Sequence, residues 1–318
     1  IGDVPMKMCW PRFGSDSNSE YNETPTDYFY ADLTGNWNID ADSYFGEHDD
    51  DYGVPGGVDL TPEVLVGRIP VYDNDYSSLD SILQKIIDYE NDIENDSWRN
   101  KVLLPMSYSN AGGDSGEVGD SIKDFLLDPQ GFSSWRMYQQ GSAYSEDDSV
   151  YYSEEELRGI GYEEPSDPYQ NNVKDRWAAD DFGIVCWKGH GSYMHTAVGY
   201  SDNSDGNMIS NYDCAVLDDD HPSFTFQISC NNGWPEEHNN LGYSLLKNGA
   251  IATIPSSRVS WYTLYGYGNY DNKSFSTGLA YNYIKYLIQN HSAGYSLYYV
   301  KSNINVGGMS SLMNRFDF

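Results

Sequence analysis

The chain has 318 residues, of which 49 are acidic and 18 are Lys or Arg, and its formal net charge is −31. This length fits one large domain or two subdomains with a buried core. The hydrophobic content of 39% and the aromatic content of 15% exclude a disordered chain. The charge argues against nucleic-acid binding, because phosphate contacts need Lys and Arg. No run of 18 apolar residues occurs, so no membrane span is predicted.

The first third of the chain alternates loop-like and regular segments. The first ~60 residues are rich in Asp, Asn, Gly and Tyr and predict long loops. The run EVLVGRIPV, residues 63–71, predicts a buried strand. Apolar residues at helical spacing predict a helix over residues 77–93, capped by Ser77 or Ser78. The next predicted elements are a strand and a helix, over residues 101–109 and 121–128.

Short apolar strands and helices alternate through the rest of the chain. Residues 140–178 are polar and irregular, with a short helix predicted over 153–160. Two apolar strands follow, within FGIVCWKGHG and SFTFQISCNNGW, which are residues 182–191 and 223–234. The last predicted elements are a helix, a strand and a helix, over residues 240–249, 250–257 and 275–289. This alternation predicts an α/β fold with a mostly parallel sheet covered on both faces.

Each of the two apolar strands is followed directly by a reactive side chain, His190 in one case and Cys230 in the other. Functional groups gather at the carboxyl ends of parallel strands, so the two converge if their strands are neighbours. An imidazole can take the proton of a thiol and produce a thiolate nucleophile. The backbone N–H groups of Gly191 and Cys230 then provide an oxyanion hole. The other interpretation is a buried structural cysteine and an unrelated loop histidine.

Two other chemistries fit the residues less well. A zinc site could combine Cys186, His190, His195 and Cys230, since catalytic zinc takes three protein ligands. However, Cys186 lies inside the apolar run, where it is expected to face the core, and the sequence has no HExxH motif. A serine hydrolase is excluded for lack of a G-x-S-x-G motif.

Several motifs, in order along nearly the whole chain, resemble the gingipain family of cysteine peptidases, in the caspase–gingipain clan. GHGS resembles the histidine motif of that family, ISCNNG its nucleophile motif, and AIATIPSSRVSW the strand and Ser-Trp segment that walls the S1 pocket. EVLVGRIPV resembles the end of its N-terminal subdomain, and the acidic segment TDYFYADLTGNWNIDADSYFGE resembles a loop of the family. These segments are residues 189–192, 228–233, 250–261, 63–71 and 26–47.

The resemblance implies a caspase-like α/β/α sandwich in two subdomains and a cysteine endopeptidase that acts through a Cys–His dyad. Cys230 would be the nucleophile, His190 the general acid and base, and Gly191 a donor to the oxyanion. Trp261 would stack on the P1 side chain, and Ser257 belongs to the same wall of the S1 pocket.

The resemblance also divides the chain. Residues 1–97 would be the remnant of an N-terminal subdomain with an acidic loop, and residues 98–318 the catalytic subdomain. The chain begins and ends where family strands are expected, so we expect a piece of a longer precursor with additional domains. The location expected is extracellular or at the cell surface. Four N-x-S/T sequons agree with secretion, and they start at Asn22, Asn95, Asn272 and Asn290.

An acidic S1 pocket is a further expectation. Arg-specific members of the family place an Asp at the base of S1, in the segment equivalent to residues 112–124, where Asp114, Glu117 and Asp120 are the candidates. Such a carboxylate would pair with Arg or Lys at P1. The other interpretation is that these are helix-cap and loop carboxylates. Some members also have a carboxylate that orients the histidine, at a position where this chain offers Asn110 or Ala111.

The acidic segment NIDADSYFGEHD has oxygen ligands at the spacing of a calcium loop. Ser43 occupies the position of the glycine of an EF-hand, so the segment is not a standard EF-hand. We expect a structural Ca²⁺ here, and the other interpretation is a plain acidic turn. The expected ligands are Asn38, Asp40, Asp42, Tyr44, Glu47 and Asp49.

Three functions are consistent with these residues. The first is a secreted, Ca²⁺-stabilised cysteine endopeptidase that acts on proteins or peptides. The second is a transpeptidase-like processing enzyme for surface proteins, which would use the same dyad. The third is a non-catalytic surface or adhesion module of the same fold, and the intact Cys230, His190 and Gly191 argue against it.

Overall fold

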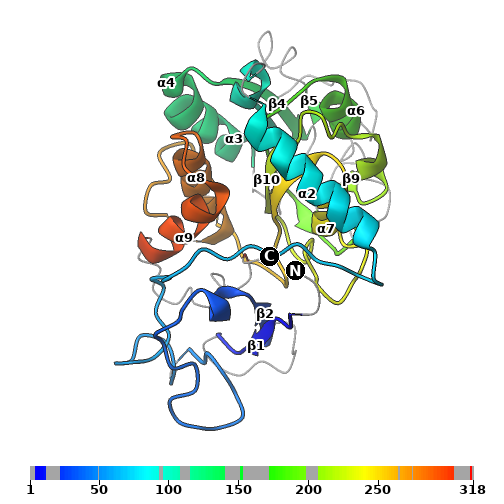
Figure 1. Cartoon of the computed structure of the whole chain (residues 1–318). Coiled ribbons are helices and arrows are strands. Elements are labelled where there is room, and N and C mark those ends of the chain that lie inside the picture. The colour runs from blue at the N-terminus through cyan, green and yellow to red at the C-terminus, as the bar shows by residue number, and fades with distance from the viewer. Residues whose placement is uncertain are drawn as a thin grey trace.

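A six-stranded sheet forms the centre of the computed structural model, in the order β11-β10-β6-β3-β4-β5 (Figure 1). Five strands are parallel, and β5 joins β4 antiparallel at one edge. The strands are β3 (Lys101–Met106), β4 (Ser133–Gln139), β5 (Tyr151–Tyr152), β6 (Ile184–Lys188), β10 (Ser223–Ile228) and β11 (Ala250–Ile254). The structure describes residues 4–11, 22–48, 50–92, 96–107, 115–139, 151–152, 172–197, 207–263, 266–273, 275–303 and 316.

The apolar runs form strands because both faces of the sheet are covered. All five residues of β6 are buried. Ile184 and Cys186 join the core on one face, and Val185 and Trp187 join the core on the other. This alternation follows the period of two of a strand, so an unbroken apolar run serves two cores.

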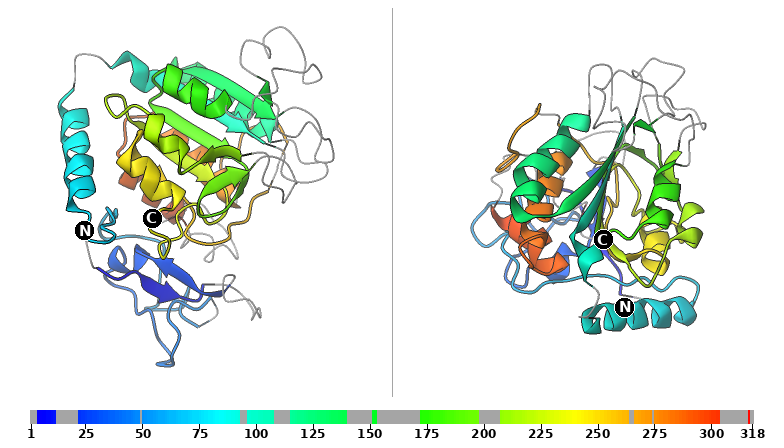
Figure 2. Two further views of the ribbon diagram at one scale, coloured as in Figure 1. Left: turned by 90° about the vertical axis from the view of Figure 1, so that its right-hand side faces the viewer. Right: turned by 90° about the horizontal axis from the view of Figure 1, so that it is seen from above.

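Helices cover both faces and complete the predicted three layers (Figure 2). One face is covered by α3 (Gly116–Ile122), which continues through a π-helical turn (Lys123–Leu127) and α4 (Asp128–Gln130), and by α8 (Phe275–Leu287) and α9 (Ala293–Asn303). The other face is covered by α6 (Asn172–Ala179) and α7 (Leu241–Lys247). The mostly parallel α/β sandwich predicted from the sequence is therefore confirmed.

Helix α2 (Tyr76–Asn91) packs against α7 through Ile82, Tyr243 and Leu246. Its N-cap is Asp75, whose carboxylate accepts a bond of 3.1 Å from the N–H of Ser78. The prediction that Ser77 or Ser78 caps this helix was therefore wrong. A carboxylate at the N-terminus of a helix satisfies a free N–H and also interacts favourably with the helix dipole.

The N-terminal segment forms a small core of its own beside the sheet (Figure 1). Strands β1 (Lys7–Cys9) and β2 (Thr24–Thr26) pair antiparallel, and a 3-10 turn (Tyr28–Tyr30) follows. Tyr28 stacks on Tyr298 of α9 with 5.7 Å between ring centroids, so this core is joined to the part of the chain that contains the six-stranded sheet. The subdomain boundary at residue 97 stays a prediction.

The strand predicted over residues 63–71 is not present, and this part of the chain is extended without a strand partner. Val64 and Leu65 are exposed. Side chains hold the segment instead: the Glu63 carboxylate accepts from the N–H of Leu33 at 2.7 Å, and Arg68 forms a two-point ion pair with the buried Asp27. An apolar run forms a strand only where a neighbouring strand is available, and none of the described strands pairs with this segment.

Three smaller features complete the described chain. A second sheet contains β7 (His190–Gly191), β8 (His195–Ala197) and β9 (Asn207–Ser210), and two 3-10 turns lie at Ser97–Asn100 and Asp213–Val216. The helix predicted over 153–160 lies outside the described residues. Within the described part of the chain, every helix is too short or too polar to span a lipid bilayer.

Candidate active site

The parallel pairing of β6 with β10 brings the histidine and the cysteine to one edge of the sheet. In this register Lys188 lies opposite Ile228, and the N–H of Gly189 donates to the Ile228 carbonyl at 3.2 Å. Each chain needs two more residues to reach His190 and Cys230. Equal steps from a paired position place the two residues side by side past the carboxyl ends of neighbouring strands, where active sites of α/β sheets lie.

Gly191 is in direct contact with the main chain of Cys230. A Cβ atom added to Gly191 would lie 2.0 Å from the Cys230 carbonyl oxygen and 2.7 Å from its amide nitrogen. Real Cβ atoms do not approach other atoms so closely, so only glycine fits without displacing one of the two segments. The glycine therefore has a steric role that its sequence position did not reveal, in addition to its predicted role as an N–H donor.

Asn232 joins the histidine hairpin to the cysteine loop, and sequence reasoning missed it. Its buried amide group donates to the carbonyl of Ser192 at 2.6 Å and to that of His195 at 3.0 Å. Its carbonyl oxygen accepts from the hydroxyls of Thr196, at 2.8 Å, and Ser229. Three of these bonds, to Ser192, His195 and Thr196, fix the histidine hairpin against the cysteine loop, since leaving the buried amide of Asn232 unpaired would be costly.

The Cys230 thiol is half-buried. Its Sγ lies 3.4 Å from the Ser260 carbonyl oxygen and 3.5 Å from the Ser260 nitrogen. The next residue, Asn231, has a φ of +57°, a left-handed conformation that asparagine tolerates better than most residues. Its N–H donates to the Arg258 carbonyl at 3.1 Å, so the turn after the thiol is tied to the chain that follows β11.

Trp261 directly follows the serine whose main chain contacts Cys230 Sγ. Ser276 in α8 donates both its N–H and its hydroxyl to the Trp261 carbonyl, at 3.1 and 2.8 Å. The half-buried indole packs against the core cluster beneath α8. The main chain of Trp261 is therefore fixed next to a residue that contacts the thiol, and its stacking on a P1 side chain stays a prediction.

The other predicted S1 residues separate into different environments. Ser257 is buried, and its hydroxyl donates to the Pro25 carbonyl at 3.3 Å. Asp120 forms a 2.6 Å ion pair with Arg136 and accepts from Tyr138 at 2.8 Å. Asp114 lies outside the described residues.

Glu117 is the acidic candidate whose carboxylate lies near the chain that follows Trp261. Its Oε2 would lie 3.9 Å from a Cβ atom at Gly266, in the chain that follows Trp261. The same chain is bonded to α3, because the N–H of Gly268 donates to the Ser121 hydroxyl at 3.1 Å. Helix α3 and the segment after Trp261 are therefore neighbours, and the Glu117 carboxylate lies between them.

Cys186 is fully buried in the core on the α8 side, and burial raises the pKa of its thiol. The structure thus agrees with the expectation that Cys186 faces the core. Residues 108–114, which include Asn110 and Ala111, are outside the described part of the chain.

Lys188 is a second residue that sequence reasoning missed. It is 1% exposed at the end of β6. Burial lowers the pKa of its amine to about 7, and a negative charge on Cys230 acts in the opposite direction. Its Nζ lies 3.6 Å from the centroid of the Tyr262 ring. The only signal for Lys188 in the sequence was its position at the end of an apolar run. A strand end that reaches solvent has the same sequence pattern, so the burial of Lys188 could not be predicted.

The acidic loop brings together a different set of carboxylates from the predicted one. Asp40, Glu47 and Asp50 each place one carboxylate oxygen within 4.8 Å of the others. The side chains of Asn38 and Asp42 instead bond to main-chain groups of the loop.

Glu47 is the group in this loop most affected by its surroundings. Burial and the neighbouring carboxylates of Asp42, Asp40, Asp50 and Asp51 raise its pKa to about 7. Of the other predicted ligands, Tyr44 is exposed with its ring against Trp10, and Asp49 lies outside the described residues.

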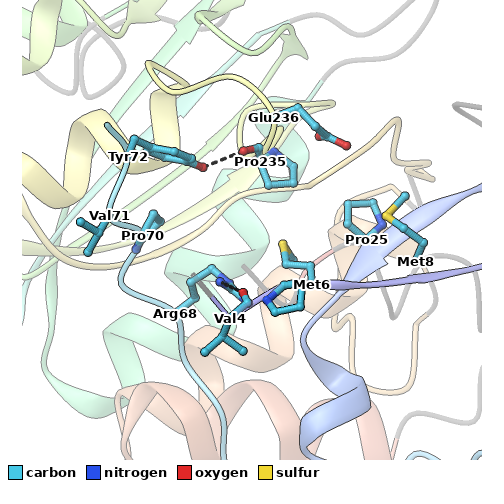
Figure 3. Close-up of a pocket in the computed structure, with 11 residues that line it drawn as sticks. Val4, Met6, Met8, Pro25, Arg68, Pro70, Val71, Tyr72, Pro235 and Glu236 are labelled. Carbon is cyan, nitrogen blue, oxygen red and sulfur yellow. Dashed lines mark hydrogen bonds between the residues drawn. The ribbon is translucent and has the colours of Figure 1, made fainter. Parts of the chain in front are cut away.

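A separate cavity of about 410 Å³ lies between the N-terminal strands and the loop after Cys230 (Figure 3). Tyr72 closes one side, where its hydroxyl donates to the Pro235 carbonyl at 2.9 Å. Met6, Met8 and Pro25 supply apolar lining. Neither His190 nor Cys230 lines this cavity, so it is distinct from the strand-end site.

A parallel α/β sandwich with cysteine and histidine at adjacent strand ends defines a cysteine-peptidase class of site. The model described as Peptidase family C25, a family of cysteine peptidases, matches residues 2–316. The chain therefore belongs to peptidase family C25, as the gingipain-like motifs predicted. No curated protein sequence matches the chain.

Two solved structures are similar to this chain. The crystal structure of the Arg-specific cysteine proteinase gingipain R has a TM-score of 0.61 and 15% sequence identity. The complex of the pro- and mature domains of RgpB from Porphyromonas gingivalis has a TM-score of 0.61 and 14% identity. Each match covers 92% of this chain, and the chain spans only 57% and 58% of the two matched chains. At this identity the likeness establishes the fold.

The Gly191 contact leads to a direct test. We expect Gly191→Ala to lower kcat/KM on a peptide substrate roughly 100-fold, because the methyl group would displace one segment by about an ångström. Gly67→Ala is the matched control, since a Cβ there would meet no atom within 4 Å. Equal activity of the two variants would contradict the contact.

Proposed function

We propose that the protein is a cysteine endopeptidase in which Cys230 is the nucleophile and His190 the general acid and base. The observation that carries the proposal is the contact of Gly191 with the Cys230 main chain at the ends of paired strands. This contact supports a dyad because it fixes the residue after the histidine against the cysteine itself. Membership of a cysteine-peptidase family supports the same chemistry.

In the proposed reaction the imidazole of His190 takes the proton of the Cys230 thiol. The thiolate attacks the carbonyl carbon of the scissile bond, and the N–H groups of Gly191 and Cys230 donate to the oxyanion. The imidazolium then protonates the leaving amine. Water attacks the resulting thioester, releases the carboxylate product and restores the thiol. The bonds of Asn232 would keep both loops in place through these steps.

The dyad is tested by covalent labelling with peptidyl acyloxymethyl ketones, which modify an activated cysteine. Rapid modification of the peptide that contains Cys230, with at least a 100-fold loss in His190→Ala, is the expected result. His238→Ala is the matched control, because His238 is an exposed histidine that pairs with Asp73. Labelling that is equally fast in the two variants would remove His190 from the mechanism.

We propose further that Glu117 makes the S1 pocket acidic and favours Arg or Lys at P1. The position of its carboxylate, close to the chain that follows Trp261, supports this choice over Asp120, which is paired with Arg136. A cationic P1 side chain could stack on Trp261 and pair with the carboxylate, as guanidinium groups do with planar rings and carboxylates.

Glu117→Gln is expected to lower kcat/KM for an Arg-P1 substrate by about 10- to 100-fold and to leave a Leu-P1 substrate nearly unchanged, because only the first loses a charged pair. Asp128→Asn, at the far end of the same helical segment, is the control. An equal loss on both substrates would contradict a role in specificity.

We propose that Asp40, Glu47 and Asp50 hold a structural Ca²⁺. The three carboxylate oxygens within 4.8 Å of one another and the raised pKa of Glu47 support this proposal. Because the pKa of Glu47 is raised in the folded state, the folded protein loses stability as the pH rises from 4.5, the ordinary pKa of a Glu side chain, toward 7. A divalent cation would offset that repulsion.

Adding Ca²⁺ at neutral pH is expected to raise the Tm by roughly 5 °C at a hundredfold excess over Kd. Asp40→Asn should abolish the increase. Asp181→Asn should keep it, because Asp181 belongs to a separate acidic group with Asp218 and His221. A Tm that is the same in Ca²⁺ and in chelator would refute the site.

We also propose that the protein is secreted and acts on protein substrates beside further domains. Four sequons and the net charge of −31 support an extracellular location. One of the similar structures is a complex of pro- and mature domains, which supports an arrangement with additional domains here.

A further inference from the structure

Lys188 lies directly beneath the two proposed catalytic residues. It is the last residue of β6 and is paired with Ile228, and His190 and Cys230 follow two positions later on their respective chains. By strand alternation its side chain shares a sheet face with Cys186. This is the face covered by α3 and α8, on which Trp261 and Tyr262 also pack.

The amine and the thiol are connected through one short segment of chain. Nζ of Lys188 lies 3.6 Å from the ring centroid of Tyr262. Two residues earlier, the main chain of Ser260 contacts Cys230 Sγ at 3.4 and 3.5 Å. Residues 260–262 therefore contact the thiol at one end and the ammonium group at the other. A negative charge on Cys230 raises the pKa of Lys188.

A buried ammonium group is costly unless an anion or another favourable partner accompanies it. Among the residues that the structure describes, no carboxylate forms an ion pair with Lys188. The ring of Tyr262 offsets part of the cost through a cation–π interaction. A thiolate at Cys230 would supply the missing negative charge.

The other titratable groups around Lys188 do not supply that charge. The Cys186 thiol and the Tyr283 phenol are buried, and burial raises the pKa of each, which keeps both neutral. The remaining titratable groups at this end of the sheet are His190, Tyr262 and Glu117, and the Glu117 carboxylate lies toward Gly266 and forms no described ion pair with Lys188.

We propose that Lys188 is a positioning residue whose ammonium group stabilises the thiolate of Cys230. The inference rests on the proposed function, in which Cys230 is the nucleophile. A positive charge close to a thiol lowers its pKa and raises the fraction of thiolate. His190 keeps its role in proton transfer to the leaving amine, and Lys188 does not touch the substrate.

The test is the rate of alkylation of Cys230 by iodoacetamide as a function of pH, followed by mass spectrometry of the Cys230 peptide. Lys188→Met removes the charge and keeps the length, and Lys188→Arg keeps the charge. We expect the midpoint of the Lys188→Met curve to rise by about one pH unit. Below the midpoint the rate would then fall about tenfold, because thiolate fraction changes tenfold per unit of pKa. Lys188→Arg should retain most of the wild-type rate.

Lys247→Met is the matched control, since Lys247 is another lysine over a tyrosine ring, 4.8 Å from the centroid of Tyr243. Its alkylation curve should superimpose on that of the wild type. The Tm of Lys188→Met should not fall, because a methionine in place of a buried charge removes a desolvation cost. A retained Tm separates a change in thiol reactivity from loss of the fold.

Superimposable curves for Lys188→Met and the wild type would overturn the inference. So would a loss in Lys188→Met that is confined to ketone probes with an acidic P1, since that result would make Lys188 a specificity residue. Failure of the proposed function gives a different result: Cys230 would then resist the ketone probes in the wild type itself, and His190→Ala would change nothing.

Discussion

The contact between Gly191 and the main chain of Cys230 is the constraint on which the rest of the site depends. It exists because β6 and β10 are parallel neighbours and because each continues for two residues beyond the last paired position. Any side chain at Gly191 would separate the strands at the point where the two reactive residues meet. The register of the sheet therefore determines where the site lies, and the conformations of the loops follow from it.

The surrounding polar groups hold the two segments in this contact. Asn232 joins the two loops through three bonds, and the chain after β11 fixes the thiol through Ser260 and the turn at Asn231 through Arg258. Helix α8 in turn holds Trp261 through Ser276. The histidine hairpin and the chain after β11 thus both bond to the cysteine loop, so the fold itself fixes the position of Cys230.

The sequence was sufficient for the layers of the fold and for the placement of His190 and Cys230 at the ends of neighbouring strands, because apolar runs and parallel pairing follow local periodicity. It could not predict what depends on distant partners. The run over 63–71 looks like a strand, but it pairs with side chains such as Asp27. Asp120 and Glu117 look alike in sequence, and only the position of Arg136 on β4 separates them.

Asn232 and Lys188 illustrate the same limit at the site itself. A loop asparagine next to the nucleophile gives no sign that it joins two loops until β8 is in place. A lysine after four apolar residues is usually a strand end that reaches solvent. Here the ring of Tyr262, 74 positions away in the chain as numbered, covers it.

The most direct test of the account is a crystal structure of the protein with a peptide aldehyde bound. The account predicts a bond from Cys230 Sγ to the aldehyde carbon, with the resulting oxygen within hydrogen-bond distance of the N–H groups of Gly191 and Cys230. The imidazole of His190 should lie on the side of the leaving group. An adduct on another residue, or an oxygen that points away from both N–H groups, would contradict it.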